Sequence, residues 1–355
     1  MISALICSLI PMGLLAVSAC PAVTFGSDGN AHIVDLRIPI PKTISHEAQE
    51  MLKARAAAAQ PSTDPTQKVG VIRAAYANNQ SRVTEQLLRM YSATVRKQSL
   101  AGVPVTVVTP KTARADLRDR LLINVHGGAF FLGQGSFEEA IPIAARTGLT
   151  VMSVDYRLAP ENPFPAAVDD IVAVYRELLK SYTPQHLALY GSSAGAIITA
   201  EATVRARQLG LPLPAALGFF SGTVDFARAG DSEAFFTDGG LGPTVLPIAV
   251  TASLYLDGTS PIDPVVSPAY ADVKEFPPVL LMCGSRDFFL SGTLNFHRQL
   301  LRAGVDARLV VFDAMPHVHW ENPDLPESKE ALDIQARFLS EKVDDSREAK
   351  IDGQR

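Results

Sequence analysis

Residues 187–200 read LALYGSSAGAIITA, and this short stretch decides the predicted fold. Its first four residues are apolar and suit a buried strand, whereas its last residues suit the first turns of a buried helix. Two glycines and two serines lie between these parts, so the strand must turn sharply into the helix. The turn can be an ordinary glycine-rich connection, or it can be sharp because it presents the hydroxyl of Ser193 as a nucleophile.

Strand-like and helix-like segments alternate along most of the chain. Helical spacing of apolar residues marks residues 165–182, 293–304 and 327–343. Short apolar runs that are rich in β-branched residues indicate buried strands at 103–109, 120–126, 150–156, 186–191, 215–220, 278–284 and 307–312. This alternation predicts an α/β fold in which a mostly parallel central sheet has helices on both faces.

Two parts of the chain depart from this alternation. Ala-rich amphipathic segments within 45–92 precede the first clear strand, so we expect residues 21–99 to form N-terminal cap helices. Residues 224–258 contain many Gly, Phe and Ala residues without a strand–helix repeat, and we expect a second cap insertion there. The predicted core is then 100–345, and the polar residues 346–355 form a tail.

The chain starts with MISALICSLIPMGLLAVSAC, an uncharged apolar run that ends in small residues. Residues 1–20 are typical of a signal peptide cleaved before Cys20, although the run lacks Lys and Arg. Its last four residues resemble a lipobox, which would make Cys20 a lipid-modified residue. We therefore expect export, as a periplasmic or secreted protein or as a membrane-anchored lipoprotein. A wrongly assigned start and an apolar helix of the folded domain are the alternatives.

The composition excludes several classes of function. The 355 residues include 32 basic and 37 acidic ones, and no basic cluster is present, so no nucleic-acid partner is expected. The three cysteines, Cys7, Cys20 and Cys283, do not indicate a disulfide framework. Metal-ligand spacings and phosphate-binding loops are missing, and no cofactor is expected. The sequence leaves the oligomeric state open, and a homodimer is compatible with it.

The turn after residue 190 contains the pattern G-x-S-x-G, with Ser193 at its centre. Cleavage of a carboxylic ester needs an exposed hydroxyl, a nearby base and backbone N–H groups that stabilise negative charge. A helix that begins at Ala194 aims free N–H groups at this point. Residues 124–133, NVHGGAFFLG, follow another strand, and the amides of Gly127 and Gly128 could join that of Ala194 in an oxyanion hole.

The base and the acid of such a site must come from later strands. His317 and His319 follow the strand at 307–312, and Asp287 follows the strand before it. The chain order Ser193, Asp287, His317 is that of α/β-hydrolases. His319 stays an alternative base, and we expect His126 to brace its loop.

Several motifs together resemble those of the bacterial hormone-sensitive-lipase-type esterases, a family of the α/β-hydrolase superfamily. They are HGGAF, DYRLAPENPFPAAVDD, GSSAG, GSRD and MPHVHW, within residues 100–340. The resemblance implies a triad of Ser193, Asp287 and His317, an oxyanion hole and a helical cap. It also implies that Asp155, Arg157 and Glu161 brace the scaffold. Two departures are Ala129 at a glycine of the family and Ser192 where many members carry an acidic residue.

The sequence thus predicts a serine carboxylesterase that hydrolyses short- to medium-chain esters of small molecules through an acyl-enzyme. The chain length is implied by the resemblance alone. A deacetylase or amidase on an acylated natural product would use the same residues, and a non-catalytic ligand-binding relative is a third alternative. Six phenylalanines could wall an acyl pocket or belong to the ordinary core: Phe130, Phe131, Phe219, Phe220, Phe288 and Phe289.

Overall fold

The structure is a computed structural model, and it describes residues 23–25, 27, 31–33, 38–57, 69–133, 137–238 and 248–344. The predicted signal peptide with Cys20 and the predicted tail lie outside the described residues. The chain divides into two units, residues 1–41 and residues 42–355. In the first unit, β1 (Val23–Phe25) pairs with β2 (Ala31–Ile33) in an antiparallel ladder.

The second unit is built on an eight-stranded, mostly parallel sheet. Its strands are β3 (Ala93–Leu100), β4 (Val103–Pro110), β5 (Leu121–Val125), β6 (Thr150–Val154), β7 (Leu187–Ser192), β8 (Ala216–Phe220), β9 (Val279–Arg286) and β10 (Ala307–Pro316). They lie in the order β10-β9-β8-β7-β5-β6-β4-β3. The pairs β3–β4 and β4–β6 are antiparallel, and the remaining pairs are parallel. The predicted fold class and all seven predicted strands are confirmed.

Strand β3 was not predicted, and it lies within the segment expected to form cap helices. Its sequence, ATVRKQSL, is polar, and its residues alternate between half-buried and exposed over much of its length. Such a pattern suits an edge strand with one face in water, and edge strands commonly carry charged residues. The strand pairs with β4 through a tight turn at Ala101 and Gly102, both with positive φ.

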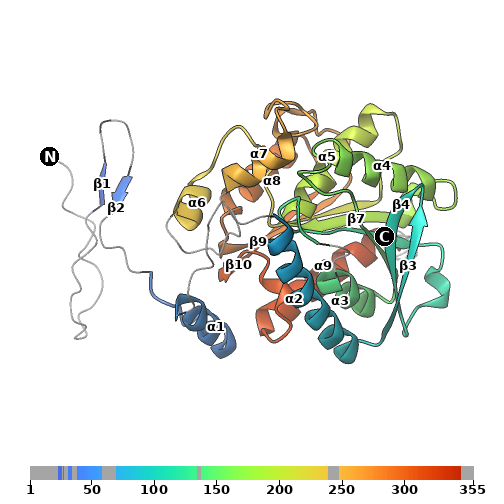
Figure 1. Cartoon of the computed structure of the whole chain (residues 1–355), viewed down its shortest axis with the longest axis horizontal. Coiled ribbons are helices and arrows are strands. Elements are labelled where there is room, and N and C mark those ends of the chain that lie inside the picture. The colour runs from blue at the N-terminus through green and yellow to red at the C-terminus, as the bar shows by residue number, and fades with distance from the viewer. Residues whose placement is uncertain are drawn as a thin grey trace, which may run out of the picture. The chain divides into compact units, whose positions relative to one another are not determined.

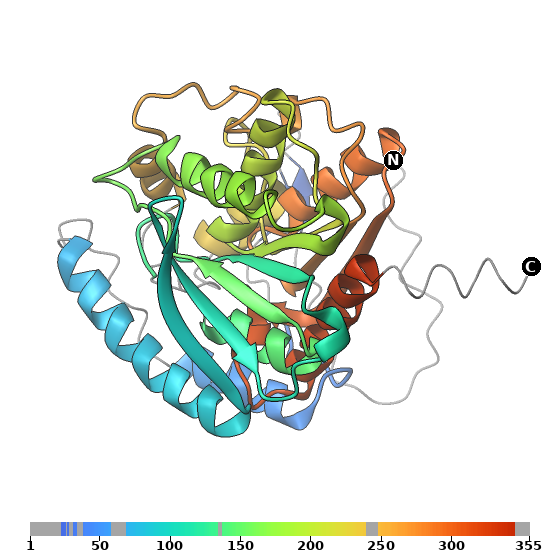
Figure 2. The same cartoon turned by 90° about the vertical axis from the view of Figure 1, so that its right-hand side faces the viewer.

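Helices cover both faces of the sheet, as Figures 1 and 2 show. On one face, α3 (Phe137–Thr147) packs against α9 (Pro326–Val343). On the other, α4 (Ala166–Leu178) packs against α5 (Ala194–Gln208), and α8 (Leu290–Arg302) covers β9 and β10. Every residue of β5, β7 and β8 is buried, because these central strands carry helices on both sides. No described helix has the length and apolar character that crossing a membrane requires.

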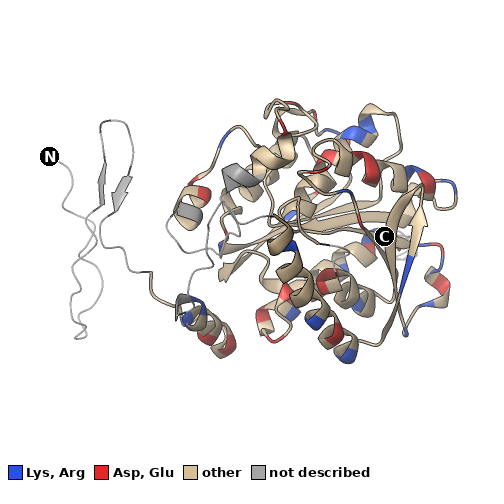
Figure 3. Cartoon of the chain, viewed as in Figure 1, with Lys and Arg blue, Asp and Glu red and all other residues tan. Residues whose placement is uncertain are grey.

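Elements from both predicted cap segments contact the loop that follows β5. Helix α2 (Val69–Met90) packs on α3, and its Ile72 contacts Phe131 and Leu132 of that loop. Leu254 of α7 (Ile248–Leu256) packs against the same group. In contrast, α1 (His46–Ala57) packs against α9. Acidic and basic residues are interspersed along α1 and α2 (Figure 3).

The remaining elements are short. They are α6 (Asp231–Glu233), the 3-10 helices η1 (Ala115–Leu117), η2 (Pro184–His186), η4 (Pro268–Tyr270) and η5 (His319–Glu321), and the π-helical turn η3 (Ala234–Asp238). Both α6 and η3 lie in the predicted second insertion, together with α7.

Candidate active site

Ser193 is the single residue between β7 and α5, and its backbone is strained. It has φ 57° and ψ −127°, a conformation that costs a non-glycine residue about 1–3 kcal/mol. Its N–H donates to the carbonyl of Phe220 in the neighbouring strand at 2.9 Å, which holds the turn. A Cβ at Gly195 would lie only 2.0 Å from the carbonyl oxygen of Val125, so the turn can pack against β5 only with glycine there. The small residues beside Ser193 are therefore a steric requirement of the turn.

The structure brings the three predicted triad residues together. The Nε2 atom of His317 lies 2.9 Å from the Oγ of Ser193. The Nδ1 atom of the same ring lies 2.9 Å from Oδ1 of Asp287. The three side chains follow β7, β9 and β10, whose carboxyl ends meet at one edge of the parallel sheet. A single imidazole thus connects the carboxylate to the hydroxyl.

Asp287 is fully buried and accepts hydrogen bonds on both oxygens. Oδ1 accepts from the N–H of Phe289 at 2.9 Å as well as facing His317, and Oδ2 accepts from the hydroxyl of Ser221. Burial acts to raise the pKa of Asp287, but the charge and hydrogen bond of His317, followed by Ser221 and Phe289, outweigh it. The pKa of Asp287 is therefore held below its usual range, and the group stays a carboxylate facing His317.

The loop that carries His317 is fixed to the serine turn. Val318 has φ 47°, in the left-handed region, so the chain bends sharply right after His317. The indole Nε1–H of Trp320 donates to the Oγ of Ser192 at 3.0 Å. Both groups are buried. The residue next to the predicted nucleophile thus holds the loop of the predicted base.

The other two histidines singled out in the sequence lie elsewhere. His319 is buried between Phe312 and Trp320, with ring centroids 4.8 Å and 5.0 Å away. The alternative base would have to contact the Oγ of Ser193. His317 makes that contact instead of His319. The His126 ring stacks on Tyr156 with centroids 4.2 Å apart, and its Nδ1 lies 2.7 Å from the carbonyl oxygen of Gly127, in the loop that it was expected to brace. Burial lowers the pKa of each ring to about 4, so both are neutral at pH 7.

The predicted oxyanion-hole residues border Ser193. A Cβ built on Gly127 would lie 3.3 Å from the Cβ of Ser193, which puts the loop after β5 against the serine. Gly128 has φ 109°, and its carbonyl accepts from the N–H of Leu132 at 2.8 Å, which closes a tight turn. Ala194 is the first residue of α5, so its N–H has no acceptor within the helix.

Arg73, which lies in no recognisable sequence motif, joins α2 to the loop after β5. Its guanidinium donates to the carbonyl of Phe131 at 2.7 Å and to both oxygens of Glu161 at 2.7 Å each. Arg157 makes a similar bidentate pair with Asp170. The expectation that Glu161 and Arg157 brace the scaffold is therefore confirmed by their contacts, and Asp155 accepts from Thr106 at 3.2 Å.

A second side-chain contact joins α7 to α5, the helix that follows Ser193. Tyr255 donates its hydroxyl proton to Glu201 of α5 at 2.5 Å, and its ring stacks on Phe130 with centroids 4.0 Å apart. Glu201 is fully buried, and this burial raises its pKa well above the usual range. Burial therefore favours the neutral form of this carboxyl group more than water does.

The six phenylalanines divide between site and core. Phe288 and Phe289 contact His317, with centroids 4.2 Å and 5.6 Å from its ring. Phe219 is buried against Phe296, and Phe220 against Trp320. Phe131 is buried under α2, and Phe130 under Tyr255. Only the pair after Asp287 thus borders the reacting side chains directly.

A strained serine after a central strand, with an aspartate and a histidine after two later strands of a mostly parallel sheet, defines the α/β-hydrolase class. Comparison with known proteins agrees. A family profile described as the alpha/beta hydrolase fold matches residues 122–321.

Relatives and solved structures narrow the assignment. An acetyl-hydrolase of Streptomyces hygroscopicus is 35% identical over 64% of this chain and 77% of its own length. An esterase of Acinetobacter venetianus is 30% identical over 73% of this chain and 87% of its own. An esterase crystal structure has a TM-score of 0.77 with 31% identity over 87% of this chain and 98% of its own. Another, from the bacterial hormone-sensitive lipase family, has a TM-score of 0.70 with 33% identity over 84% and 97%. The chain belongs to the α/β-hydrolase superfamily and, within it, to this family of bacterial esterases.

Proposed function

We propose that the protein is a serine carboxylesterase that hydrolyses short- to medium-chain esters through an acyl-enzyme. The observation that carries the proposal is His317, whose two ring nitrogens lie 2.9 Å from Ser193 and 2.9 Å from Asp287. Nucleophilic acyl transfer needs a hydroxyl that contacts a base, and a carboxylate that orients this base. The names of the relatives, esterase and acetyl-hydrolase, support the same reaction class.

In the first step, the Oγ of Ser193 attacks the ester carbonyl while Nε2 of His317 takes the hydroxyl proton. Asp287 accepts from Nδ1–H, which fixes the tautomer and stabilises the imidazolium that forms. The carbonyl oxygen becomes negative, and in this proposal the N–H groups of Gly127, Gly128 and Ala194 bind it. One such donor is typically worth about 3–4 kcal/mol of barrier.

The tetrahedral intermediate then collapses. The bond from carbon to the alkoxy oxygen breaks, His317 returns its proton to the leaving alcohol, and the acyl group stays on Ser193. In the second step water attacks the acyl carbon while His317 takes a proton from it. The bond between the acyl carbon and Oγ then breaks, His317 returns the proton to Oγ, and a carboxylic acid leaves Ser193. The ester and one water molecule thus give an alcohol and a carboxylic acid.

The first prediction concerns the nucleophile. Ser193→Ala should lower kcat for p-nitrophenyl butyrate by about 10⁶-fold, because it removes the hydroxyl that lies 2.9 Å from Nε2 of His317. The matched control is Ser99→Ala on the exposed edge strand, which should keep wild-type kcat. Turnover by Ser193→Ala above a thousandth of the wild-type rate would show that the nucleophile is another residue.

A deacetylase is the second candidate, and the acetyl-hydrolase relatives favour it. A panel of p-nitrophenyl acetate, butyrate and octanoate beside an O-acetylated sugar and an N-acetylated amine separates the two. Comparable kcat/KM on the acetate and butyrate esters is expected for the carboxylesterase. Selective turnover of the acetylated sugar or amine would favour the deacetylase. A non-catalytic relative would fail to react with a serine-directed phosphonate.

Export of the protein and lipid attachment at Cys20 stay proposals that rest on the composition of residues 1–20. They are tested by fractionation of cells that express the whole chain. Recovery of all the protein, uncleaved, in the cytoplasmic fraction would contradict export.

A further inference from the structure

A cavity of about 400 Å³ lies beside α8, and none of its lining residues belongs to the triad. Its buried walls include Thr223, Val224 and Gly292, which are small or apolar. Three guanidinium groups border it, those of Arg228, Arg298 and Arg302. A recess of this size accommodates a small molecule.

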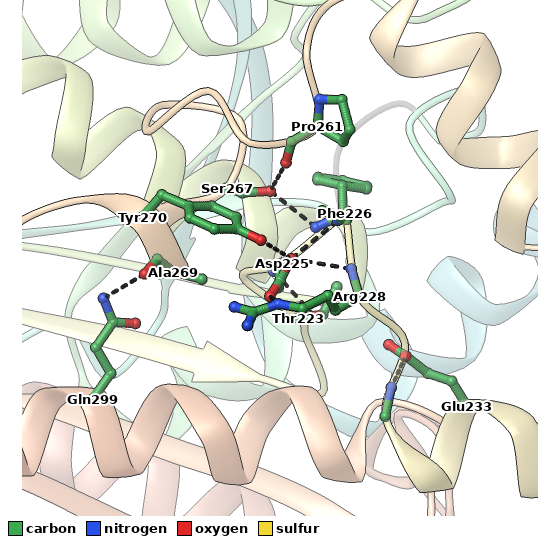
Figure 4. A network of polar contacts seen from close by, with 12 residues as sticks. Thr223, Asp225, Phe226, Arg228, Glu233, Pro261, Ser267, Ala269, Tyr270 and Gln299 are labelled. Carbon is green, nitrogen blue, oxygen red and sulfur yellow. Dashed lines mark hydrogen bonds and ion pairs between the residues drawn. The ribbon is translucent and has the colours of Figure 1, made fainter. Parts of the chain in front are cut away.

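The arginine charge in the cavity is only partly balanced. The lining contains three arginines against two carboxylates, Asp225 and Glu233. Asp225 is already engaged, because it accepts from Nε of Arg228 at 2.8 Å and from the hydroxyl of Tyr270 at 3.2 Å (Figure 4). The Arg228 guanidinium also lies over the Tyr270 ring, 5.4 Å from its centroid. Glu233 accepts from the N–H of Gly230 at 2.6 Å.

Arg298 and Arg302 are the uncompensated cations. They lie one turn apart on α8, at i and i+4, where like charges repel. Both are exposed, and within the described part of the chain neither forms an ion pair or a hydrogen bond. Asn295 and Gln299 line the cavity beside them, and Gln299 is fixed by its bond to the carbonyl of Pro268 at 2.9 Å.

We propose that this cavity binds a small organic anion, whose carboxylate or phosphate group is held by Arg298 and Arg302. Guanidinium groups match the planar, bidentate geometry of such oxyanions. Val224 and Ala269, which also line the cavity, would contact the apolar part of the ligand. This site goes beyond the proposed esterase function, and its existence does not depend on that function.

One wall of the cavity is formed by residues of the segment 223–233. This segment begins two residues after Ser221, whose hydroxyl donates to Asp287, and it contains Ser232, whose hydroxyl donates to the carbonyl of Phe288 at 2.8 Å. Ser291 at the start of α8 donates its N–H to the Oγ of Ser232 at 2.8 Å. An anion that bridges this wall and α8 would restrain the loop of the triad acid, so its binding should change the rate of ester turnover.

Calorimetric titration of the full chain with sodium phosphate and, separately, with sodium butyrate tests the binding. We expect one site, with affinity at least about tenfold weaker in the double variant Arg298→Gln, Arg302→Gln, which is about 1.4 kcal/mol. The matched control is Arg176→Gln with Arg337→Gln, two exposed arginines on α4 and α9. The anion that binds with the higher affinity shows whether the site prefers a phosphate or a carboxylate group. Absence of binding by both anions, or equal binding in both double variants, would overturn the proposal.

The coupling is tested by kcat/KM for p-nitrophenyl butyrate with and without saturating phosphate. We expect a change of about fivefold in the wild type and in the control variant, and none in the Arg298, Arg302 variant. Equal rates with and without the anion in the wild type would refute the coupling. If the chain did not hydrolyse esters at all, the calorimetric result would still decide whether the anion site exists.

Discussion

Ser221 supports the predicted triad acid without contacting His317. Its backbone has φ 53°, and its hydroxyl donates to Oδ2 of Asp287, the oxygen that faces away from His317. Hydrogen bonds to a carboxylate stabilise the charged form. Ser221 therefore helps to keep Asp287 ionised in a site where burial alone would neutralise it.

Ser221→Ala should lower kcat about tenfold with little change in KM, because a hydrogen bond to a charged group contributes about 1.5–3 kcal/mol. The loss of the bond also raises the pKa of Asp287, so activity on the acid side should be lost at a higher pH than in the wild type. Steady-state kinetics between pH 4 and 8 measure both effects. Ser221→Gly tolerates the positive φ and lacks the hydroxyl, so it should show the same loss. Full activity in Ser221→Gly would show that the hydroxyl is not needed.

Single residues differ in how well the sequence could predict them. Ser193 and the glycines on either side of it lie in a motif whose spacing reflects a backbone requirement, and the structure shows that requirement at Gly195. The choice between His317 and His319 could not be made with equal security, because the two lie two residues apart after one strand. The left-handed turn at Val318 separates the two rings. Ser221 could not be predicted, since the loop after β8 has no motif.

At the scale of elements, the loop of the predicted base is joined to the nucleophile turn by one buried hydrogen bond, Trp320 to Ser192. Many members of the family have an acidic residue at the position of Ser192. A neutral hydroxyl can accept the indole N–H there without placing a buried charge beside Ser193.

A double-mutant cycle measures this tie. Trp320→Phe keeps an aromatic ring beside Phe220 and loses the indole N–H, and Ser192→Ala removes the acceptor. Each change should lower the free energy of unfolding, and the double variant should lose about 1 kcal/mol less than the sum of the single losses. Urea unfolding gives the energies, and kcat should fall in each variant because His317 is less firmly held. Additive losses would mean that the hydrogen bond contributes nothing.

Elements were predictable where they are buried. Strands of the sheet centre are mostly apolar, and their runs are easily recognised in the sequence. The edge strand β3 was missed because half of it faces solvent, so its sequence resembles that of a polar loop. The contacts that join α2 and α7 to the rest of the fold were not predicted either. Arg73 and Tyr255 reach partners 88 and 54 residues away in the chain, and such pairs have no local signal.

For the whole molecule, the alternation of strands and helices was sufficient to predict the sheet and its two helical layers, because short connections between parallel strands allow few topologies. The convergence of Ser193, Asp287 and His317 follows from that topology, since the carboxyl ends of the parallel strands share one edge. The anion cavity does not follow from it. Arg298 and Arg302 look like ordinary residues of an amphipathic helix until the walls around them are known.

The stability of the whole fold should depend on two buried histidines. Burial holds the pKa of His126 and His319 at about 4, below the usual 6.5. Between these values the unfolded chain binds more protons than the folded one, so stability is full above pH 6.5 and falls as the pH falls toward 4. Each histidine should account for about 2 kcal/mol between pH 7.5 and 5. Glu201 acts in the opposite sense, because its raised pKa favours folding at low pH.

Because these contributions overlap, the prediction is a difference between variants. His319→Phe fits an aromatic environment of Phe312 and Trp320 and removes one titrating group. Its free energy of unfolding, from urea titrations at pH 7.5 and 5, should fall by about 2 kcal/mol less than that of the wild type over this interval. His319→Gln, a polar variant that does not titrate, should show the same reduced dependence if the phenylalanine packs poorly. An unchanged pH dependence in both variants would mean that His319 is as readily protonated in the fold as in the unfolded chain.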